Sequence, residues 1–277
     1  MNLSRLRVPF TCLVVSEATA DGCLRAMARF ESIVDSYELN LPPIDPAGVG
    51  DVLHSTSRPC LVTHRRARFM EVYGYSGLPE IGEEERAEAL RRAVGLGAAA
   101  VDLELDAFRG PPSVRDGPTI GRGAAARRPP AALSTDRVSV EKQSRFAAEV
   151  RGLGAEVVFS CHTGGVLRES LARRIVEEAE ARGGQFAKVV SLTPRREDVL
   201  GLLGCAAALR GRTKVPFTLM NVGVGMNSAR LLSLLAGSSW VYCRPSDGEH
   251  VYEGQPRAED ARLFLDSLAP LRAPRPS

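Results

Sequence analysis

The sequence predicts a (β/α)8 barrel, and three observations support this fold class. Eight short apolar or β-branched runs are spread along the chain, and longer stretches with helical periodicity separate them. Eight strand–helix repeats are typical of a closed barrel, because open doubly wound sheets more often have about five to seven strands. No G-x-G-x-x-G motif of a dinucleotide-binding sheet follows the first run. We therefore expect residues 1–277 to form a single barrel domain.

Each strand is expected where β-branched and other apolar residues gather in a short run. The first run follows Arg5 and Arg7 as in a signal peptide, but acidic Glu17 and Asp21 come directly after it. We therefore expect it to be a strand, and the protein to be cytoplasmic and reduced. The expected strands are Phe10–Val15, Ser36–Leu41, Cys60–His64, Ala99–Leu105, Glu156–Cys161, Phe186–Leu192, Phe217–Val222 and Ser239–Cys243.

Helices are expected between the strands, where apolar residues recur at helical spacing. Asp136 is a capping residue before one of them, and Thr193-Pro194 is expected to open another with proline in its first turn. Gly152 and Gly183-Gly184 follow two helix ends, a position that favours glycine. The expected helices are Ala20–Ile33, Glu83–Val94, Val138–Arg151, Leu167–Arg182, Arg195–Leu209, Ala229–Leu235 and Ala258–Leu268.

Two segments have neither periodicity. Residues 106–135 are rich in proline, glycine and arginine, which predicts an irregular insertion after the fourth strand. Barrels build their active sites on that side, so the insertion could be a lid, although a disordered surface loop is the commoner structure for such a composition. The tail 269–277 contains three prolines and is expected to be frayed.

The composition excludes several kinds of partner. The chain has 36 basic and 33 acidic residues, and a net charge of +3 is too small to hold nucleic acid or an anionic membrane. Aromatic residues make up only 5%, which leaves few rings to stack on bases. No apolar run is long enough to span a membrane. The six cysteines have no C-x-x-C spacing, so we expect buried thiols and no metal site.

Lys188 is the most informative single residue. It lies inside the apolar strand Phe186–Leu192, where an ammonium group is costly to bury unless it is paired or used. Pointing inward, it would lose its proton more easily and attack a carbonyl to form a Schiff base. Pointing outward at a strand end, it would be a structural lysine. His162 ends the preceding strand, where barrels place catalytic groups, and a proton-transferring histidine near Lys188 indicates an active site.

Polar residues also follow or end four other strands, and they belong at the same mouth of the barrel. These residues are Glu38, Arg65, Arg230 and Gln255. Arg65 could neutralise a carboxylate of the barrel or bind a carboxylate of the substrate with its forked donors. Asp102 and Glu104, both in the fourth strand, could equally form salt bridges that fill the barrel floor.

With these residues assembled, the chain resembles type I 3-dehydroquinate dehydratase from about Val8 to Leu268. Ala187-Lys188-Val189 resembles the V-K-I around the imine-forming lysine of that family, and Met220–Leu231 is similar without a gap to M-S-M-G-x-x-G-x-x-S-R-L. Five further motifs follow the family order. They are Asp35–Glu38 (D-x-V-E-x-R), Thr63–Arg65 (F-T-x-R), Val101–Leu105 (V-D-V-E-L), Val158–His162 (V-S-x-H) and Gly254–Pro256 (S-A-P-G-Q-P).

The resemblance implies a lyase of the shikimate pathway that converts 3-dehydroquinate into 3-dehydroshikimate without a cofactor. Lys188 would form the imine, and His162 would remove the neighbouring proton and help water to leave. The resemblance assigns the orientation of the imidazole to Glu38, the substrate carboxylate to Arg230, and the substrate hydroxyl groups to Arg65 and Gln255. We expect the chain to form a homodimer and to bind one small-molecule partner, its substrate.

The chain departs from the family pattern around the expected site. Asn40 and Pro42 replace an arginine and an aspartate, and Phe69 stands where the family has a glutamate. Three further substitutions are Met226 for glycine, Ala229 for serine and Val251 for serine. Two alternatives follow: a Schiff-base aldolase acting on a small ketoacid, which needs no arginine like Arg230, and a non-catalytic barrel derived from the family.

Overall fold

The computed structural model describes residues 1–109, 133–246 and 251–268. Eight parallel strands follow the sheet order β7-β6-β5-β4-β3-β2-β1-β8 and alternate with helices, which confirms the predicted (β/α)8 barrel. The chain divides into two compact units. The first unit comprises Met1–Asp102, Gly152–Glu156 and Ser239–Ser277, and the second comprises Leu103–Arg151 and Val157–Ser238.

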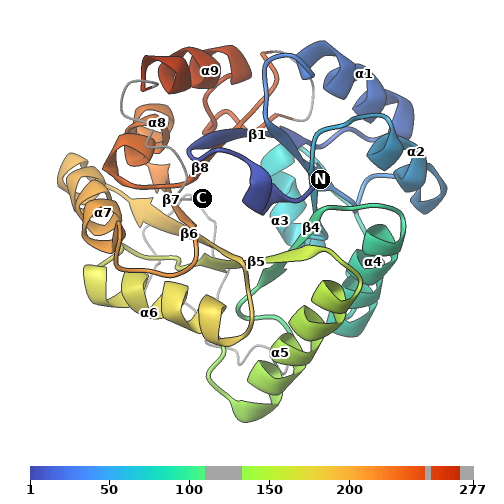
Figure 1. Ribbon diagram of the computed structural model, residues 1–277, viewed down its shortest axis with the longest axis horizontal. Helices are drawn as coiled ribbons and strands as arrows, with labels where there is room; N and C mark the ends of the chain where they lie inside the picture. The colour runs from blue at the N-terminus through green and yellow to red at the C-terminus, as the bar shows by residue number, and fades with distance from the viewer. Residues whose placement is uncertain (110–132, 247–250, 269–277) are drawn as a thin grey trace. The chain divides into compact units, whose positions relative to one another are not determined.

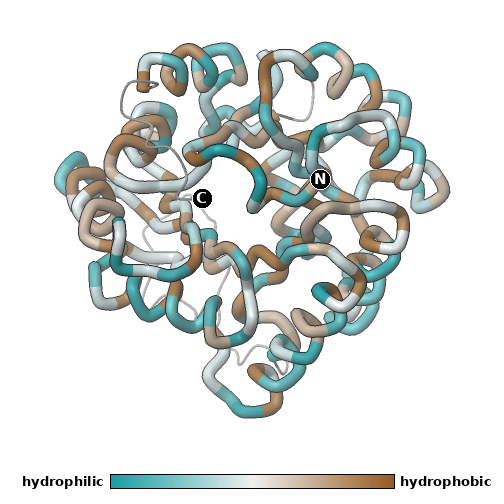
Figure 2. The backbone as a smooth tube through the Cα atoms, in the orientation of Figure 1, coloured by the Kyte–Doolittle hydropathy of each residue, from teal (hydrophilic) through white to brown (hydrophobic). Residues whose placement is uncertain are grey.

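All eight predicted strands form, and each begins and ends within two residues of its predicted bounds. The strands are β1 (Phe10–Val15), β2 (Ser36–Asn40), β3 (Cys60–Thr63), β4 (Ala100–Glu104), β5 (Glu156–His162), β6 (Phe186–Thr193), β7 (Phe217–Gly223) and β8 (Trp240–Cys243). Most strand residues are buried, whereas the helices alternate hydrophobic and hydrophilic stretches (Figure 2). This difference is expected, because a helix covers the strands with only one of its faces.

The seven predicted helices are also present, together with short helices that the periodicity did not reveal. The long helices are α1 (Ala20–Phe30), α4 (Glu83–Gly95), α5 (Arg137–Gly152), α6 (Glu169–Ala181), α7 (Arg196–Leu209), α8 (Met226–Ala236) and α9 (Ala258–Ser267). The additional ones are α2 (Val49–His54), α3 (Ala67–Met70) and the 3-10 turns η1 (Leu3–Arg5), η2 (Pro46–Gly48) and η3 (Glu71–Tyr73). Helices this short span too few turns for an apolar period to be visible.

The predicted helix starts were partly correct. Asp136 caps α5, since its Oδ1 accepts a hydrogen bond from the N–H of Ser139 at 2.8 Å. The prediction that Thr193-Pro194 opens α7 was wrong, because Thr193 is the last residue of β6 and the helix begins at Arg196. Asp198, in the first turn of α7, provides the cap by accepting from the N–H of Arg195 at 3.0 Å.

In the first unit, β1 pairs with β2 on one side and with β8 on the other. Helix α1 covers one face of these strands, and its contact with Tyr37 on β2 shows which face that is (Figure 1). The Tyr37 hydroxyl donates to the carbonyl of Met27 in α1 at 2.9 Å. Because side chains alternate along a strand, the next residue, Glu38, lies on the opposite face, which the long described helices do not cover and which is called the helix-free face below.

In the second unit, α6, α7 and α8 lie side by side along β6 and β7 (Figure 1). Phe159 on β5 faces these helices, and its ring packs against Gly184, just after α6. A Cβ atom on Gly184 would lie 2.7 Å from that ring and 2.9 Å from the carbonyl of Ala179, so only glycine fits here. Ser160 and His162 therefore alternate onto the opposite, helix-free face of β5.

Most of the predicted insertion, residues 110–132, lies outside the described residues, as does the predicted tail 269–277. The two ends of the insertion are held together at its base. The N–H of Ser134 donates to the carbonyl of Leu105 at 2.8 Å, and buried Arg182 donates to both the Leu105 carbonyl at 3.2 Å and the Ser134 carbonyl at 2.7 Å. Glu178 neutralises Arg182 at 2.9 Å, which offsets the cost of burying the guanidinium.

Candidate active site

The second unit places Lys188 in the middle of a row of polar side chains. The strand register aligns Ser160 of β5 with Lys188 of β6, and Lys188 with Thr218 of β7. Adjacent strands lie about 4.8 Å apart, so each hydroxyl neighbours the lysine. All three residues are at least 95% buried and share the helix-free face. The side chain of Lys188 thus lies between two hydroxyl-bearing residues.

His162 lies one row further toward the carboxyl end of the strands. It is two residues beyond Ser160 and therefore projects from the same face of β5, in register with Val190 of β6. Val190 is in turn two residues beyond Lys188, so His162 and Lys188 are diagonal neighbours on adjacent strands. His162 is half-buried, whereas Lys188 is buried below it. A substrate lying against His162 would therefore have the amine of Lys188 beneath it.

Cys161 does not lie on the face of Lys188 and His162. It alternates with His162 toward the helices and is 2% exposed. Burial raises the pKa of its thiol, and the carboxylate of Asp106 raises that pKa further. Because the thiolate is the nucleophilic form, the thiol of Cys161 is inert. All six cysteines are buried thiols, as the scattered spacing predicted for most of them.

Glu104 is a residue to which the sequence analysis assigned no definite role. The N–H of Leu105 donates to the carbonyl of Ser160 at 2.7 Å, and this ladder bond sets Glu104 at the end of β4 beside Ser160. Glu104 is 5% exposed. The row through Lys188 therefore continues onto β4 with the buried carboxylate of Glu104. In the sequence, only the V-D-L-E-L pattern pointed to Glu104.

Arg230, on α8, is anchored at the carboxyl end of β7. Its Nη2 and Nε donate to the carbonyl of Asn221 at 2.9 Å and 3.3 Å, and the residue is 3% exposed. Gly223 makes the β7–α8 turn possible, because its φ is +131° and a Cβ atom there would lie 2.4 Å from the Thr193 carbonyl. This turn brings the guanidinium of Arg230 to the end of β7.

The first unit carries the other predicted residues on its own helix-free face. Glu38 is 2% exposed and lies in register with Val14 and Leu61. The next row toward the carboxyl end aligns Asn40, Thr63 and Asp102. This face therefore has two buried carboxylates, Glu38 and Asp102, on strands β2 and β4.

Arg65 neutralises one of these carboxylates. It forms an ion pair with Asp102 in which both side chains are at most 2% exposed, so the expectation that Arg65 could neutralise a barrel carboxylate is confirmed for Asp102. The Arg65 guanidinium also lies 5.6 Å from the centre of the Phe69 ring, a cation–π distance. Burial raises the pKa of Tyr242 well above its ordinary value, and nearby Glu38 and Asp102 raise it further, so the phenol stays protonated.

Gln255 lies beyond β8 in the first unit and is 4% exposed. Arg244, the residue after β8, holds this segment: its N–H donates to the carbonyl of Pro256 at 3.0 Å, and its carbonyl accepts from the N–H of Ala258 at 2.9 Å. Arg244 also pairs with Glu253 at 2.9 Å. The two backbone bonds form an isolated parallel bridge between Arg244 and Arg257, which fixes the backbone next to Gln255.

The sequence analysis treated Asn40 only as a departure from a pattern, but the structure gives it a defined environment. Its Nδ2 donates to Oγ of Ser16, and the hydroxyl of Tyr75 donates to the Ser16 carbonyl. Asn40 Oδ1 and Thr63 Oγ1 are buried and have no hydrogen-bond partner among the described residues. Two neighbouring polar atoms in one row are therefore available to a polar ligand.

The described residues contain neither a candidate metal cluster nor a candidate membrane span. No group of three or more His, Cys, Asp and Glu side chains has an arrangement that could hold a metal ion. Among the helices of residues 1–109, 133–246 and 251–268, none is both long and apolar enough to cross a membrane.

Known proteins share the sequence pattern and the fold of this chain. The family described as type I 3-dehydroquinase matches residues 11–271. A 3-dehydroquinate dehydratase from Geobacillus kaustophilus aligns with a TM-score of 0.74 and 20% identity over 99% of this chain and 97% of its own. The type I enzyme from Clostridium difficile, solved with covalently modified comenic acid, has a TM-score of 0.71 and 16% identity over 95% and 93%. A search of curated proteins found no match.

Proposed function

Because the chain belongs to the type I 3-dehydroquinase family, we propose that it dehydrates 3-dehydroquinate to 3-dehydroshikimate through an imine on Lys188. The observation that carries this proposal is the position of Lys188 on the helix-free face of the second unit. The lysine is buried between Ser160 and Thr218, and His162 lies one row above it. An amine and an imidazole on one face of adjacent strands supply a nucleophile and a proton-transfer group.

The reaction would begin when the neutral amine of Lys188 attacks the ketone carbon and water leaves to form the imine. The protonated imine is an electron sink, so the neighbouring C–H becomes acidic and His162 removes its proton. The electron pair then expels the hydroxyl group on the next carbon, and the same histidine returns a proton so that water departs. Hydrolysis of the imine releases the product and restores the amine of Lys188.

Arg230 would bind the carboxylate of the substrate. Its guanidinium is held at the carboxyl end of β7, the same end of the strands at which His162 completes β5. A forked guanidinium pairs with a carboxylate through two charge-assisted hydrogen bonds. The anchoring bonds to the Asn221 carbonyl keep the group oriented before the substrate arrives, which reduces the entropy lost on binding.

The roles implied for the residues of the first unit stay predictions. Glu38 is buried on the helix-free face, as a residue that orients an imidazole would be, and Gln255 is fixed by the segment around it. Arg65 is already paired with Asp102, so we propose that Asp102 holds the guanidinium in the orientation needed for a substrate hydroxyl group. Asn40 Oδ1 and Thr63 Oγ1 are further candidates for such a hydroxyl group.

The test combines a rate assay with chemical trapping. The protein is incubated with 3-dehydroquinate, product formation is followed by its absorbance, and borohydride is added to reduce any imine. Mass mapping should find the adduct on Lys188, and a Lys142→Ala variant should behave like the unaltered protein, because Lys142 lies in α5 on the outside of the second unit.

Each outcome has a definite meaning. Turnover with an adduct on Lys188 supports the proposal. An adduct without turnover would favour a non-catalytic barrel, and turnover of ketoacid aldols in place of dehydroquinate would favour an aldolase. Label on Lys142 or Lys214 would overturn the assignment of the nucleophile.

A further inference from the structure

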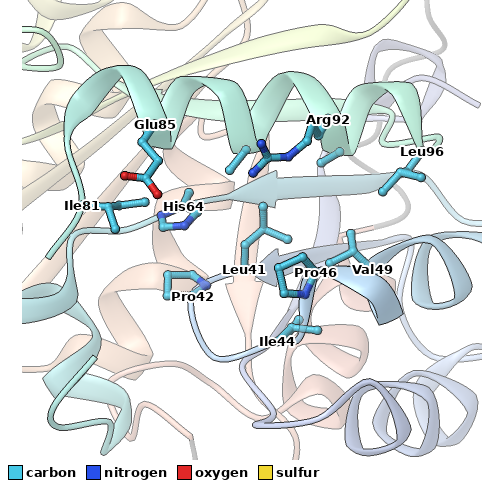
Figure 3. Close-up of a pocket in the computed structure, with 12 residues that line it drawn as sticks. Leu41, Pro42, Ile44, Pro46, Val49, His64, Ile81, Glu85, Arg92 and Leu96 are labelled. Carbon is cyan, nitrogen blue, oxygen red and sulfur yellow. The ribbon is translucent and has the colours of Figure 1, made fainter. Parts of the chain in front are cut away.

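The first unit has a pocket of about 310 Å³ on the helix side of its sheet. One wall is helix α4, and the other is the segment from Leu41 to Val49 that follows β2 (Figure 3). None of its lining residues belongs to the face of Glu38 and Asp102. The volume is at the small end of the usual range for ligand pockets, about 300–1,000 Å³, so it suits a molecule the size of one amino acid.

Both walls of the pocket are fixed by hydrogen bonds. In the loop wall, the N–H of Leu41 donates to the carbonyl of Thr63 and the N–H of Ile44 donates to the carbonyl of Leu41, each at 2.9 Å. On the helix wall, Nε of Arg86 donates to the carbonyl of His64 at 2.8 Å, which ties α4 to the end of β3. Pro42 and Pro46 stiffen the loop further. The pocket is therefore formed before any ligand binds.

Apart from His64, which follows β3, the floor of the pocket is apolar. Leu41, Ile44 and Val49 are each less than 9% exposed, and Ala93 of α4 closes the floor from the helix side. Leu96, at the carboxyl end of α4, is 38% exposed and borders the opening. Covering this surface with an apolar side chain removes apolar area from water, which favours binding.

The rim carries one anion and one cation that do not pair. Glu85 and Arg92 extend from the same side of α4 toward Leu41 and His64 (Figure 3). Neither side chain has a hydrogen bond or ion pair with any residue that the structure describes. Their neighbours on the helix behave differently, since Glu83 pairs with Arg66 and Arg86, and Arg91 pairs with Glu88. The two residues are seven positions apart, about two helical turns, and both are exposed and able to move over the floor.

We propose that this pocket binds a small apolar α-amino acid as its zwitterion. The carboxylate would pair with Arg92, the ammonium group with Glu85, and the side chain would cover the floor formed by Leu41, Ile44 and Val49. A simple apolar acid would match Arg92 but leave its carboxylate near Glu85, and a simple amine would have the opposite conflict. The charges on the rim therefore favour a ligand that carries both signs.

The experiment is a calorimetric titration of the full-length protein with L-leucine and with three analogues. These are 4-methylpentanoate, which lacks the ammonium group, isoamylamine, which lacks the carboxylate, and glycine, which lacks the side chain. L-leucine should bind saturably at millimolar concentration or below, and each analogue should bind at least about ten-fold more weakly. In methyl-labelled protein, the signals of Leu41, Ile44 and Leu96 should shift on titration.

Variants locate the binding. Arg92→Ala and Glu85→Gln should each weaken L-leucine binding about ten-fold or more, whereas the matched changes Arg91→Ala and Glu84→Gln should leave it unchanged. Glu85 and Arg92 are exposed, so both variants should fold, and circular dichroism checks this. No saturable binding, equal binding of 4-methylpentanoate, or binding unaffected by both rim variants would each overturn the proposal.

Discussion

The two units of this protein carry similar parallel ladders but fill their helix-free faces differently. In the first unit, the buried carboxylate of Asp102 has a guanidinium partner, Arg65. In the second unit, the row through Lys188 places a single amine between the hydroxyl-bearing residues Ser160 and Thr218. Removing one partner of a buried ion pair destabilises a fold, whereas the row of Lys188 combines an amine with hydroxyl groups and the buried carboxylate of Glu104, which are groups suited to nucleophilic and acid–base chemistry. We therefore expect substitution of Lys188 to act mainly on the chemical step, and loss of Asp102 to act first on stability.

The largest expected effect comes from removing the amine of the second unit. Lys188→Ala should lower kcat about 10⁴-fold or more, because no other group can form the imine. The fold should remain, since the substitution removes a costly buried polar group. Steady-state rates and thermal unfolding measure both quantities. Nearly full activity in Lys188→Ala would contradict the assignment of the chemical step to Lys188 in the second unit.

His162→Ala should lower kcat by about 10²- to 10⁴-fold, the usual contribution of a positioned acid–base group. The matched control is His54→Ala, a change at an exposed position at the end of α2 in the first unit, which should leave kcat unchanged. If both variants had similar rates, His162 would be a structural residue of β5.

In the first unit, we expect mutation of the Arg65–Asp102 pair to lower the free energy of unfolding. Asp102→Asn leaves the Arg65 guanidinium buried without its charge partner, and we expect the free energy of unfolding to fall by about 3–5 kcal/mol. Urea denaturation measures this change, with Asp51→Asn at an exposed position of α2 as the control. Replacing both partners, as in Arg65→Met with Asp102→Leu, should recover much of the loss. An unchanged free energy of unfolding in Asp102→Asn would show that the pair contributes no stability.

Arg230→Ala should have the smallest of these effects, and it should act on substrate binding. Loss of a charge-assisted contact costs about 1.5–3 kcal/mol, so KM for 3-dehydroquinate should rise about ten- to a hundred-fold. Arg230→Lys should recover part of this loss, because the charge returns without the fork. The exposed Arg210 provides the control variant. A lower melting temperature with unchanged KM would instead show that Arg230 only braces β7 through Asn221.

Local sequence patterns predicted the order and type of the strands and long helices, because periodicity depends on residues close together in the chain. They also singled out Lys188 and His162, since an amine inside an apolar run and an imidazole at a strand end are visible without any partner. The start of α7 was not predictable in this way. A Thr-Pro pair is common at helix starts, but the continuation of β6 to Thr193 depends on its pairing with β7.

The sequence by itself therefore determined the barrel class, the family resemblance and the candidate residues. Only the tertiary structure decided which of them meet. Asp102 is 37 positions from Arg65, and Ser160 and Thr218 become neighbours of Lys188 only through the strand register. The pocket beside α4 likewise requires a loop that is more than thirty residues from the helix in sequence. Contacts between distant residues depend on register and on how helices pack against strands, and neither quantity is encoded in the spacing of residues along one segment.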